Sequence, residues 1–280
     1  MKVIENQTFA KERDFYGSEN VKLINCTFKG EEDGESAFKE AKNIEIVSCL
    51  WDLRYPFWHD ETLKIIDTEL TPNCRAALWY SSNITINNSK LHGIKALREC
   101  SNIKISNCDI ISPEFGWFNK NIKMTNTNVT GEYFMMRSFN LDFNKVSLKG
   151  KYSFQYIVDS VFSNCNFDTK DAFWHGKNIV VRDSIVKGEY LAWYAENLTF
   201  INCKIIGTQP LCYCKNLKLI NCEMIDCDLA FEKSDVEATI TTNVISIKNP
   251  TSGKIEVPCV NELIIDDPNS KCEINITKKD

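Results

Sequence analysis

The sequence predicts an all-β protein, a parallel β-helix of about twelve coils with three short strands in each coil. The main observation is a nine-residue phrase, Asn-Ile-x-Ile-x-Asn-Cys-x-Ile, that recurs about a dozen times. A repeat of this length is typical of a solenoid, in which each coil buries its apolar residues only against neighbouring coils. The leading positions follow at steps of 23, 19, 21 and then 19 throughout: Asn20, Asn43, Thr62, Asn83, Asn102, Asn121, Asn140, Asp159, Asn178, Asn197, Asn216 and Asp235.

Alternation of apolar and polar residues identifies the strands within a coil. Ile103 and Ile105 occupy the second and fourth places of one phrase, and this period of two predicts a strand. Cys108 and Ile110, at the seventh and ninth places, predict a second short strand after a bend at the sixth place. A third extended run follows in each coil. Leucine-rich repeats share the period but alternate strands with helices, and the crossover preference of parallel strands favours a right-handed coil.

Two rows of residues follow from the stacking of coils about 4.8 Å apart. Asparagine at the sixth place tolerates the left-handed backbone of a bend, and its amide can bond to the amide of the next coil. Cysteine at the seventh place alternates with Thr, Ser and Val, which predicts small side chains that point into the core. The sixth-place row is Asn25, Asp67, Asn88, Asn107, Asn126, Asn164, Asp183, Asn202 and Asn221, and the seventh-place cysteines are Cys26, Cys49, Cys108, Cys165, Cys203 and Cys222.

Composition limits the class of protein. The chain has 280 residues, a net charge of −5 with Lys and Arg scattered along it, and 13 cysteines. We therefore expect no nucleic-acid partner and, because no apolar run is long enough to cross a bilayer, no membrane partner. The odd number of cysteines favours a reducing, cytoplasmic location over disulfides. Cys212, Cys214, Cys222 and Cys227 have a poor spacing for zinc, so we predict no metal site, and no cofactor either.

The repeat predicts one elongated domain with closed ends. Residues 1–19 are expected to form an N-terminal cap, residues 20–235 the β-helix, and residues 236–280 a β-rich closing segment. The last boundary is placed where the repeat gives way to a stretch rich in Thr and Pro. Such ends keep the terminal coils of a solenoid from exposing an open sheet edge.

Large aromatic and charged residues gather on the third strand in numbers that core packing does not require. We predict that they bind a carbohydrate or another extended polar ligand, because rings stack on sugar faces while carboxylates and guanidinium groups bind hydroxyls. A structural interpretation stays open, since aromatic stacks stabilise β-helices and charges on adjacent coils neutralise one another. The candidate binding residues are Arg54, Trp58, His59, Arg75, Trp79, Arg98, Glu99, Trp117, Glu132, Arg137, Lys151, Lys170, Trp174, Trp193 and Tyr194.

A catalytic centre needs a general acid or base, and the candidate cluster is Asp171, His175 and Glu189. Glycoside hydrolysis uses two carboxyl groups about 5–5.5 Å apart for retention or about 6.5–9.5 Å apart for inversion. No single row of the third strand has acids on adjacent coils, and a pair from different rows, such as Asp171 with Glu189, stays open. Serine-triad, phosphate-loop and dinucleotide motifs are missing. The sequence therefore leaves open whether the protein is an enzyme, with hydrolase, lyase or isomerase action on the bound carbohydrate as the forms considered.

The third-strand strings resemble those of a known family. Asp-Gly-Glu-Ser-Ala (33–37), Leu-Arg-Tyr-Pro-Phe-Trp-His (53–59) and Cys-Arg-Ala-Ala-Leu-Trp-Tyr (74–80) are similar to strings of the domain of unknown function 3737 family. The resemblance extends over essentially the whole chain and implies a pectate-lyase-like, single-stranded right-handed β-helix. It implies no established activity and no catalytic residues, and the motifs of characterised pectate lyases and polygalacturonases are not visible. A non-catalytic scaffold or self-association module is therefore the alternative to carbohydrate binding.

Overall fold

The computed structural model describes residues 1–30 and 35–278, so Asp33 and Gly34 of the string at 33–37 lie outside the described residues. The chain divides into two compact units, residues 1–147 and 148–280, and each is a parallel β-solenoid. The predicted fold class is confirmed. The described residues contain strands but no helix, and the two units together make about 14 coils, where the sequence predicted about twelve.

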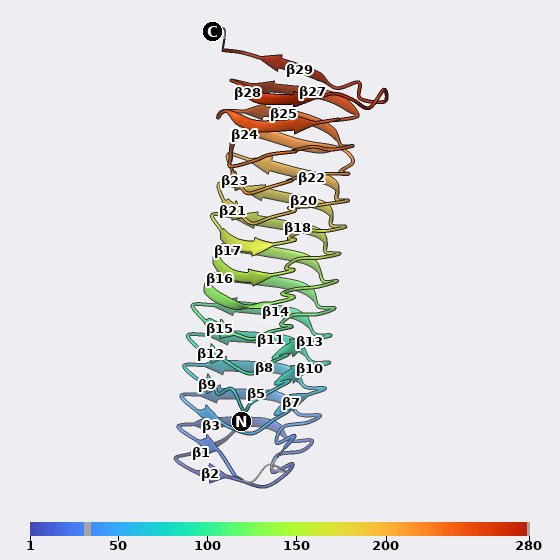
Figure 1. The fold of residues 1–280 in the computed structure, drawn as a ribbon. Helices are drawn as coiled ribbons and strands as arrows, with labels where there is room; N and C mark the ends of the chain where they lie inside the picture. Colours follow the sequence, from blue (N-terminus) through green and yellow to red (C-terminus); the bar gives the residue numbers. More distant parts are fainter. Residues whose placement is uncertain (31–34, 279–280) are drawn as a thin grey trace. The chain divides into compact units, whose positions relative to one another are not determined.

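In unit 1 the strands of successive coils lie side by side (Figure 1). The first strands are β1 (Lys2–Glu5), β3 (Glu19–Ile24), β5 (Lys42–Val47), β8 (Glu61–Ile66), β11 (Ser82–Asn87) and β14 (Ser101–Ser106). The second strands are β2 (Thr8–Phe9), β4 (Thr27–Phe28), β6 (Leu50–Trp51), β9 (Glu69–Leu70), β12 (Lys90–Leu91) and β15 (Asp109–Ile111), and the third are β7 (Phe57–Trp58), β10 (Leu78–Trp79) and β13 (Leu97–Arg98). The long strand β16 (Lys120–Glu132) pairs with both β14 and β15, and the unit boundary falls within β17 (Phe139–Lys151).

Unit 2 continues the same pattern of parallel strands. Its strands are β18 (Val158–Ser163), β19 (Asn166–Lys170), β20 (Lys177–Arg182), β21 (Ile185–Lys187), β22 (Glu196–Ile201), β23 (Lys204–Ile206), β24 (Leu217–Ile225), β25 (Asp235–Ile240), β26 (Val244–Lys248), β27 (Ser252–Val257), β28 (Val260–Ile264) and β29 (Glu273–Ile276). Residues of the third run, such as 171–175, form turns instead of strands. The segments expected to close the repeat also contain strands: β1 and β2 pair with β3 and β4, and β27 pairs with β25 and β29.

Residues 19 positions apart lie opposite one another in the sheets. Ile103 pairs with Ile84 of the preceding coil and with Ile122 of the following one. In unit 2, Ile179 pairs with Leu198 in the same way. All these side chains are buried, so each inward row is a continuous apolar column. In this register, neighbouring residues of one row lie on adjacent coils, about 4.8 Å apart.

Aromatic rings fill part of the core of each unit. In unit 1 the rings of Phe28 and Trp51 stack with centroids 3.7 Å apart, and both side chains are fully buried. In unit 2 Phe154 and Phe173 stack at 5.0 Å. Trp51 is thus a core residue, and it lies on the second strand of its coil. The other five tryptophans lie on the third run.

Asparagine side chains form hydrogen-bonded ladders along two bends. At the leading place, Asn121 Nδ2 donates to Asn102 Oδ1 (3.0 Å) and Asn140 Nδ2 donates to Asn121 Oδ1 (2.8 Å). At the sixth place the link from Asn126 to Asn107 is longer, 3.4 Å. Both places have left-handed backbones, with φ of 57° at Asn102 and 53° at Asn107. In unit 2 the leading-place ladder runs through Asp159, Asn178, Asn197 and Asn216.

The seventh-place residues are small and buried because they complete backbone hydrogen bonds. The thiol of Cys108 donates to the carbonyl oxygen of Ser106 (3.1 Å), and the backbone N–H of Cys108 donates to Thr127 Oγ1 on the next coil (3.4 Å). Ser89 and Thr68 make the same pair of contacts, which explains why Cys, Ser and Thr exchange along the row. Cys212, Cys214, Cys222 and Cys227 are likewise buried, and their thiols contact backbone carbonyls.

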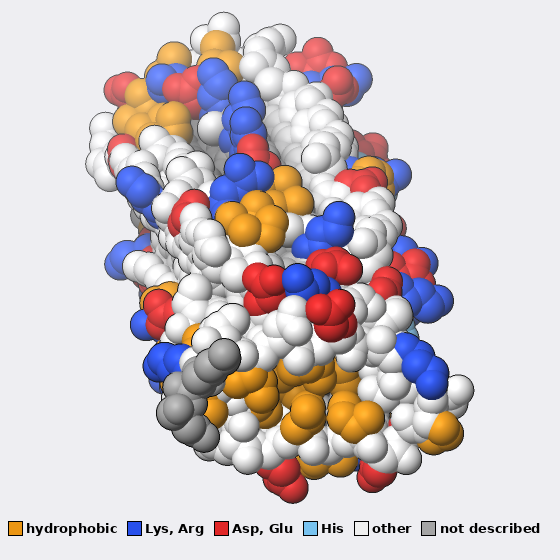
Figure 2. All heavy atoms as spheres, turned by 90° about the horizontal axis from the view of Figure 1, so that it is seen from above, with side chains coloured by type: hydrophobic (Ala, Val, Ile, Leu, Met, Phe, Trp, Pro, Cys, Tyr) orange, Lys and Arg blue, Asp and Glu red, His pale blue; other side chains and the backbone are white. Residues whose placement is uncertain are grey.

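The end of unit 2 exposes apolar side chains. Leu263, Ile265 and Ile276 are each 45–49% exposed. Figure 2 looks onto this end and shows a patch of hydrophobic side chains with acidic and basic side chains around it. Within the part of the chain that the structure describes, no helix is long and apolar enough to cross a membrane.

Candidate functional site

Two consecutive residues of each third run point outward, and the backbone explains why. Trp58 is half-buried and His59 is exposed, whereas Phe57 before them and Asp60 after them are buried. His59 has a left-handed backbone (φ 62°), which turns the chain so that two neighbouring side chains leave the core on the same side. The same pattern recurs at 78–81 and 97–100, where Tyr80 and Glu99 are left-handed. The tryptophan row predicted from the sequence therefore lies on the surface.

In unit 1 the outward rings stack from coil to coil. The Trp58 and Trp79 ring centroids are 5.0 Å apart with an interplanar angle of 3°, and His59 stacks on Tyr80 at 4.9 Å. The Arg98 guanidinium continues the row, 5.1 Å from the Trp79 ring and 5.4 Å from the Trp117 ring. Each cation–π contact of a partly exposed arginine contributes about 0.5–1 kcal/mol. Arg98 is thus held between two indoles.

Unit 2 carries two stacks of the same kind. Trp174 and Trp193 stack at 5.4 Å with an interplanar angle of 1°. Beside them, the His175 ring lies between Tyr156 at 4.9 Å and Tyr194 at 5.0 Å. Both faces of the His175 ring are therefore covered by other rings, and only its edge is left for a ligand.

The indole N–H groups are already used. Trp58 Nε1 donates to the Ala76 carbonyl oxygen (2.7 Å), and Trp79 Nε1 donates to that of Lys95 (2.8 Å). Trp117, Trp174 and Trp193 make the same bond to Tyr133, Tyr190 and Gln209. These bonds hold each ring flat against the next coil. Inside a stack, ring edges rather than ring faces meet the solvent, so a sugar ring has a free aromatic face to stack on only where a stack ends or is interrupted.

The three catalytic candidates are not joined into one hydrogen-bonded cluster. Asp171 is buried, and its backbone N–H donates to the Glu189 carbonyl oxygen on the next coil (2.9 Å). Burial raises the pKa of the Asp171 carboxyl; the Lys170 charge opposes this rise and the Glu189 charge adds to it. The Glu189 side chain is exposed. Among the described residues, no hydrogen bond or ion pair links the His175 side chain to either carboxyl group.

The remaining predicted charges lie at the start of the third run and at its end. Arg54 forms an ion pair with Glu35 (3.1 Å), and the Lys170 ammonium lies 5.7 Å from the Tyr152 ring centroid. Arg75 is exposed and has no ion pair with another described residue. Glu132 is half-buried, while Arg137 and Lys151 are exposed. Charge neutralisation between coils thus accounts for Arg54 with Glu35 and not for Arg75.

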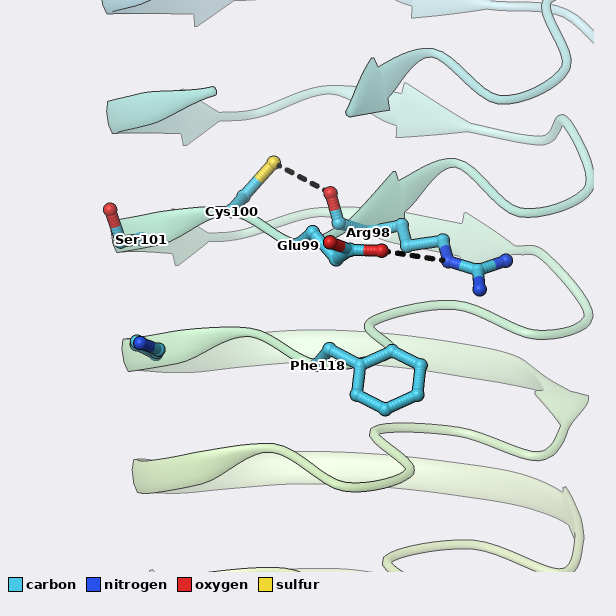
Figure 3. A pocket seen from close by; sticks show the side chains of 6 residues that line it. Arg98, Glu99, Cys100, Ser101 and Phe118 are labelled. Carbon is cyan, nitrogen blue, oxygen red and sulfur yellow. Dashed lines mark hydrogen bonds and ion pairs between the residues drawn. The ribbon is translucent and has the colours of Figure 1, made fainter. Parts of the chain in front are cut away.

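A hollow of about 590 Å³ interrupts the aromatic row in unit 1. Arg98, Glu99, Phe118 and Lys120 line it together with the buried Cys100 and the half-buried Ser101 (Figure 3). Arg98 Nε lies 3.6 Å from Glu99 Oε1, which is an ion pair but too long for a hydrogen bond. The Phe118 ring is 40% exposed and lies one coil away from Arg98, 5.7 Å from the guanidinium carbon.

Sequence reasoning missed Phe118 and Lys120 as members of this hollow. The sequence does contain a signal for this hollow, because Arg98 takes the place of Trp in a row of tryptophans and Phe118 lies in the next row. The contact between His92 and Asp109 was missed for another reason. His92 Nε2 lies 2.9 Å from Asp109 Oδ2, but these residues are 17 positions apart and fall on different rows of a 19-residue alignment. Among the described residues, no group of three or more His, Cys, Asp or Glu side chains is placed to hold a metal ion.

Comparison with known proteins identifies the family. Residues 2–277 match the family described as Protein of unknown function (DUF3737). The chain belongs to the DUF3737 family. The resemblance of the third-strand strings is thereby confirmed over nearly the whole chain. No curated protein matches the sequence.

Several solved structures are similar to this DUF3737 chain, with low sequence identity. The catalytic domain of Agl-KA has a TM-score of 0.41 and 11% identity; the match covers 99% of the DUF3737 chain and 62% of that domain. The periplasmic alginate epimerase AlgG has a TM-score of 0.33 and 9% identity, with coverage of 94% and 77%. HetL, a pentapeptide repeat protein from Nostoc sp. strain PCC 7120, has a TM-score of 0.26 and 9% identity, with coverage of 79% and 92%. At sequence identities this low, the similarity carries no information about function.

Proposed function

We propose that this protein binds a carbohydrate along the third-strand face of unit 1, at the hollow formed by Arg98, Glu99, Phe118 and Lys120. The observation that carries the proposal is the exposed Phe118 ring in a hollow that also holds a guanidinium, a carboxylate and an ammonium group. A sugar ring presents an apolar face and a rim of hydroxyls, and this hollow offers a partner for each.

Preorganisation favours binding at this place. The Arg98 guanidinium is held between the Trp79 and Trp117 rings, so its side chain loses little conformational freedom when it binds a hydroxyl. Its ion pair with Glu99 sets a donor beside an acceptor. Two adjacent hydroxyls of one sugar can bind to such a pair, one hydroxyl accepting from the donor and the other donating to the acceptor. The flanking rows of ring edges leave room for further sugar units along the coils.

The experiment is a binding measurement with a panel of neutral and acidic oligosaccharides, using isothermal titration calorimetry for every compound that binds. Phe118→Ala and Glu99→Gln are expected to weaken binding about tenfold or more, which corresponds to about 1.4 kcal/mol. Ile111→Ala is the matched control, because Ile111 is 45% exposed in the same unit but lies on the second strand. Equal affinities for all three variants and the unchanged protein would contradict the proposal.

A scaffold or self-association function is the second candidate, and one observation favours it. The stacks use up ring faces and indole donors internally, and they leave tyrosine side chains 40–44% exposed on each unit: Tyr80 on unit 1, and Tyr156 and Tyr194 on unit 2. Light scattering after size exclusion separates the two functions. A stable oligomer that Tyr194→Arg dissociates, together with no oligosaccharide binding, would favour the scaffold.

A further inference from the structure

A second hollow, of about 510 Å³, lies in unit 1 at the bend between the second and third strands. Asp52, Arg54, Asn73 and Arg75 supply its polar groups, and Pro72 and Ile94 part of its apolar wall. Its volume falls within the range of about 300–1,000 Å³ that is typical of small-molecule sites. It lies at the opposite end of the third strand from the hollow at Arg98, the last residue of β13.

The hollow lies at the bend where the repeat departs from its period. From the second strand to the third, Trp51 to Trp58 is seven residues, and Leu91 to Arg98 is also seven. The paired positions of the intervening coil, Leu70 and Trp79, are nine apart. Insertions in a solenoid map to loops on one face, often the binding face.

The carboxylate of Asp52 is oriented by groups from the longer bend. Thr71 Oγ1 donates to Asp52 Oδ1 (2.5 Å), and Asn73 Nδ2 donates to the same oxygen (3.0 Å). Neither bond uses Oδ2, and no other described residue donates to it, so Oδ2 can accept a hydrogen bond from a ligand. Asn73 belongs to the inserted bend, so the insertion creates the hollow and also supplies one of its polar groups.

The charges of the hollow balance. Arg54 is paired with Glu35 at 3.1 Å, and its guanidinium carbon lies 5.7 Å from the Tyr55 ring. Arg75 is exposed and has no ion pair with another described residue. Among the described residues, the carboxylates of Asp52 and Glu35 and the guanidinium groups of Arg54 and Arg75 give no net charge, so these groups offer both donors and acceptors without a field that would favour a polyanion. The chemistry suits a ligand rich in hydroxyl groups and without charge.

We infer that Asp52, Asn73 and Arg75 form a second binding site of unit 1, which takes a neutral saccharide unit. The inference rests on the proposed carbohydrate function and names the ligand class and the residues of an additional site. Asp52 Oδ2 accepts from a sugar hydroxyl and Arg75 donates to a neighbouring one. Pro72 and Ile94 contact the apolar face of the ring, and Arg54 is fixed by Glu35 as the wall of the hollow.

The test uses the full chain and a panel of neutral and uronate oligosaccharides of two to six units, measured by isothermal titration calorimetry. Asp52→Asn and Arg75→Ala are expected to weaken binding of neutral oligosaccharides about tenfold or more. Arg182→Ala is the matched control, because Arg182 is an exposed arginine on β20 of unit 2, and it is expected to leave affinity unchanged. Affinity for the neutral ligand is expected to change less than twofold between 50 and 500 mM salt. Thermal unfolding of each variant verifies that it folds.

Three results would overturn the inference. If Phe118→Ala abolishes binding while Asp52→Asn and Arg75→Ala leave it intact, the proposed function stands and this site does not. If only uronate oligosaccharides bind, the ligand class is wrong. If no member of the panel binds to the unchanged protein, the proposed function and the second site fail together.

Discussion

The Asp60 carboxyl is buried in a row of small polar residues, and its protonation should control the stability of unit 1. Asp60 is 2% exposed, and Oδ1 accepts a hydrogen bond from the Ala41 backbone N–H (2.8 Å). Oδ2 is buried and has no hydrogen-bond partner among the described residues. Ser81 and Ser138 occupy the same row, and their hydroxyls accept from the backbone N–H of the preceding coil and donate to a carbonyl oxygen. Serine therefore suits this position without an ionisable group.

Burial raises the pKa of Asp60 from its ordinary value of 3.8 to about 8, and the bond from Ala41 opposes the rise. Because the folded-state pKa is the higher one, the native protein binds more protons than the unfolded chain between about pH 4 and pH 8. The contribution of Asp60 is fully present below pH 4 and is lost as pH rises through this window. The free energy of unfolding should fall by about 1.4 kcal/mol per pH unit inside the window, or about 2.5 kcal/mol from pH 5 to pH 7.

The assay compares the unchanged protein with Asp60→Ser by urea unfolding at pH 5 and pH 7. Other titrating groups are common to both proteins and cancel in the difference between their free energies of unfolding. The difference should shift in favour of Asp60→Ser by about 2.5 kcal/mol on going from pH 5 to pH 7. A difference that is the same at both pH values would refute the reasoning, because it would mean that Asp60 is ionised in the folded protein throughout this range.

Three further predictions follow from the packing. Of the 13 cysteines, 11 are buried and only Cys259 and Cys272 are partly exposed, so a maleimide should label two thiols in the native protein and all 13 in denaturant. Cys108→Ser should change the thermal midpoint little, because the serine hydroxyl can still donate to the Ser106 carbonyl oxygen and accept from the Ser89 backbone N–H. Cys108→Val should lower the free energy of unfolding by about 1–3 kcal/mol, because valine has no acceptor for the buried Ser89 N–H. Gly93→Ala should destabilise unit 1 by about 1–3 kcal/mol or more, since a Cβ there would lie 2.1 Å from the Cys74 carbonyl oxygen. Gly17→Ala, where a Cβ meets no atom within 4 Å, is the control, with only the cost of its left-handed backbone.

The 19-residue period was sufficient to predict which residues stack. Parallel pairing fixes the register of a whole coil once one row is identified, so Ile84, Ile103 and Ile122 were placed correctly by counting alone. The inward position of Cys108 followed from the small residues that replace it along the row. The asparagine ladders were predicted at the sixth place, yet the described bonds are more continuous at the leading place, from Asn102 to Asn140. Both places have left-handed backbones, and sequence alone does not show which bend brings the amides closer.

The orientation of the aromatic rings was beyond the sequence. Counting placed Trp58 above Trp79, but the plane of each ring is set by the bond from its Nε1 to a carbonyl oxygen of the next coil. These bonds join residues 16 or 18 positions apart, off the 19-residue row, as does the pair of His92 and Asp109. Contacts between different rows depend on side-chain rotamers. A periodic alignment contains no information about them.

Departures from the repeat guide where binding is expected. A coil that differs from its neighbours in length, or in one outward side chain, gives that part of the face a chemistry of its own. In unit 2 the leading positions from Asp159 to Asp235 keep the 19-residue step throughout, and Asp171 and Glu189 lie in this regular part. In unit 1 the step of 21 residues from Thr62 to Asn83 includes Arg75, and the row of tryptophans is broken at Arg98. We therefore expect the ligand to bind at these departures from the repeat in unit 1, which makes the variants at Asp52, Arg75 and Phe118 more informative than those at Asp171 or His175.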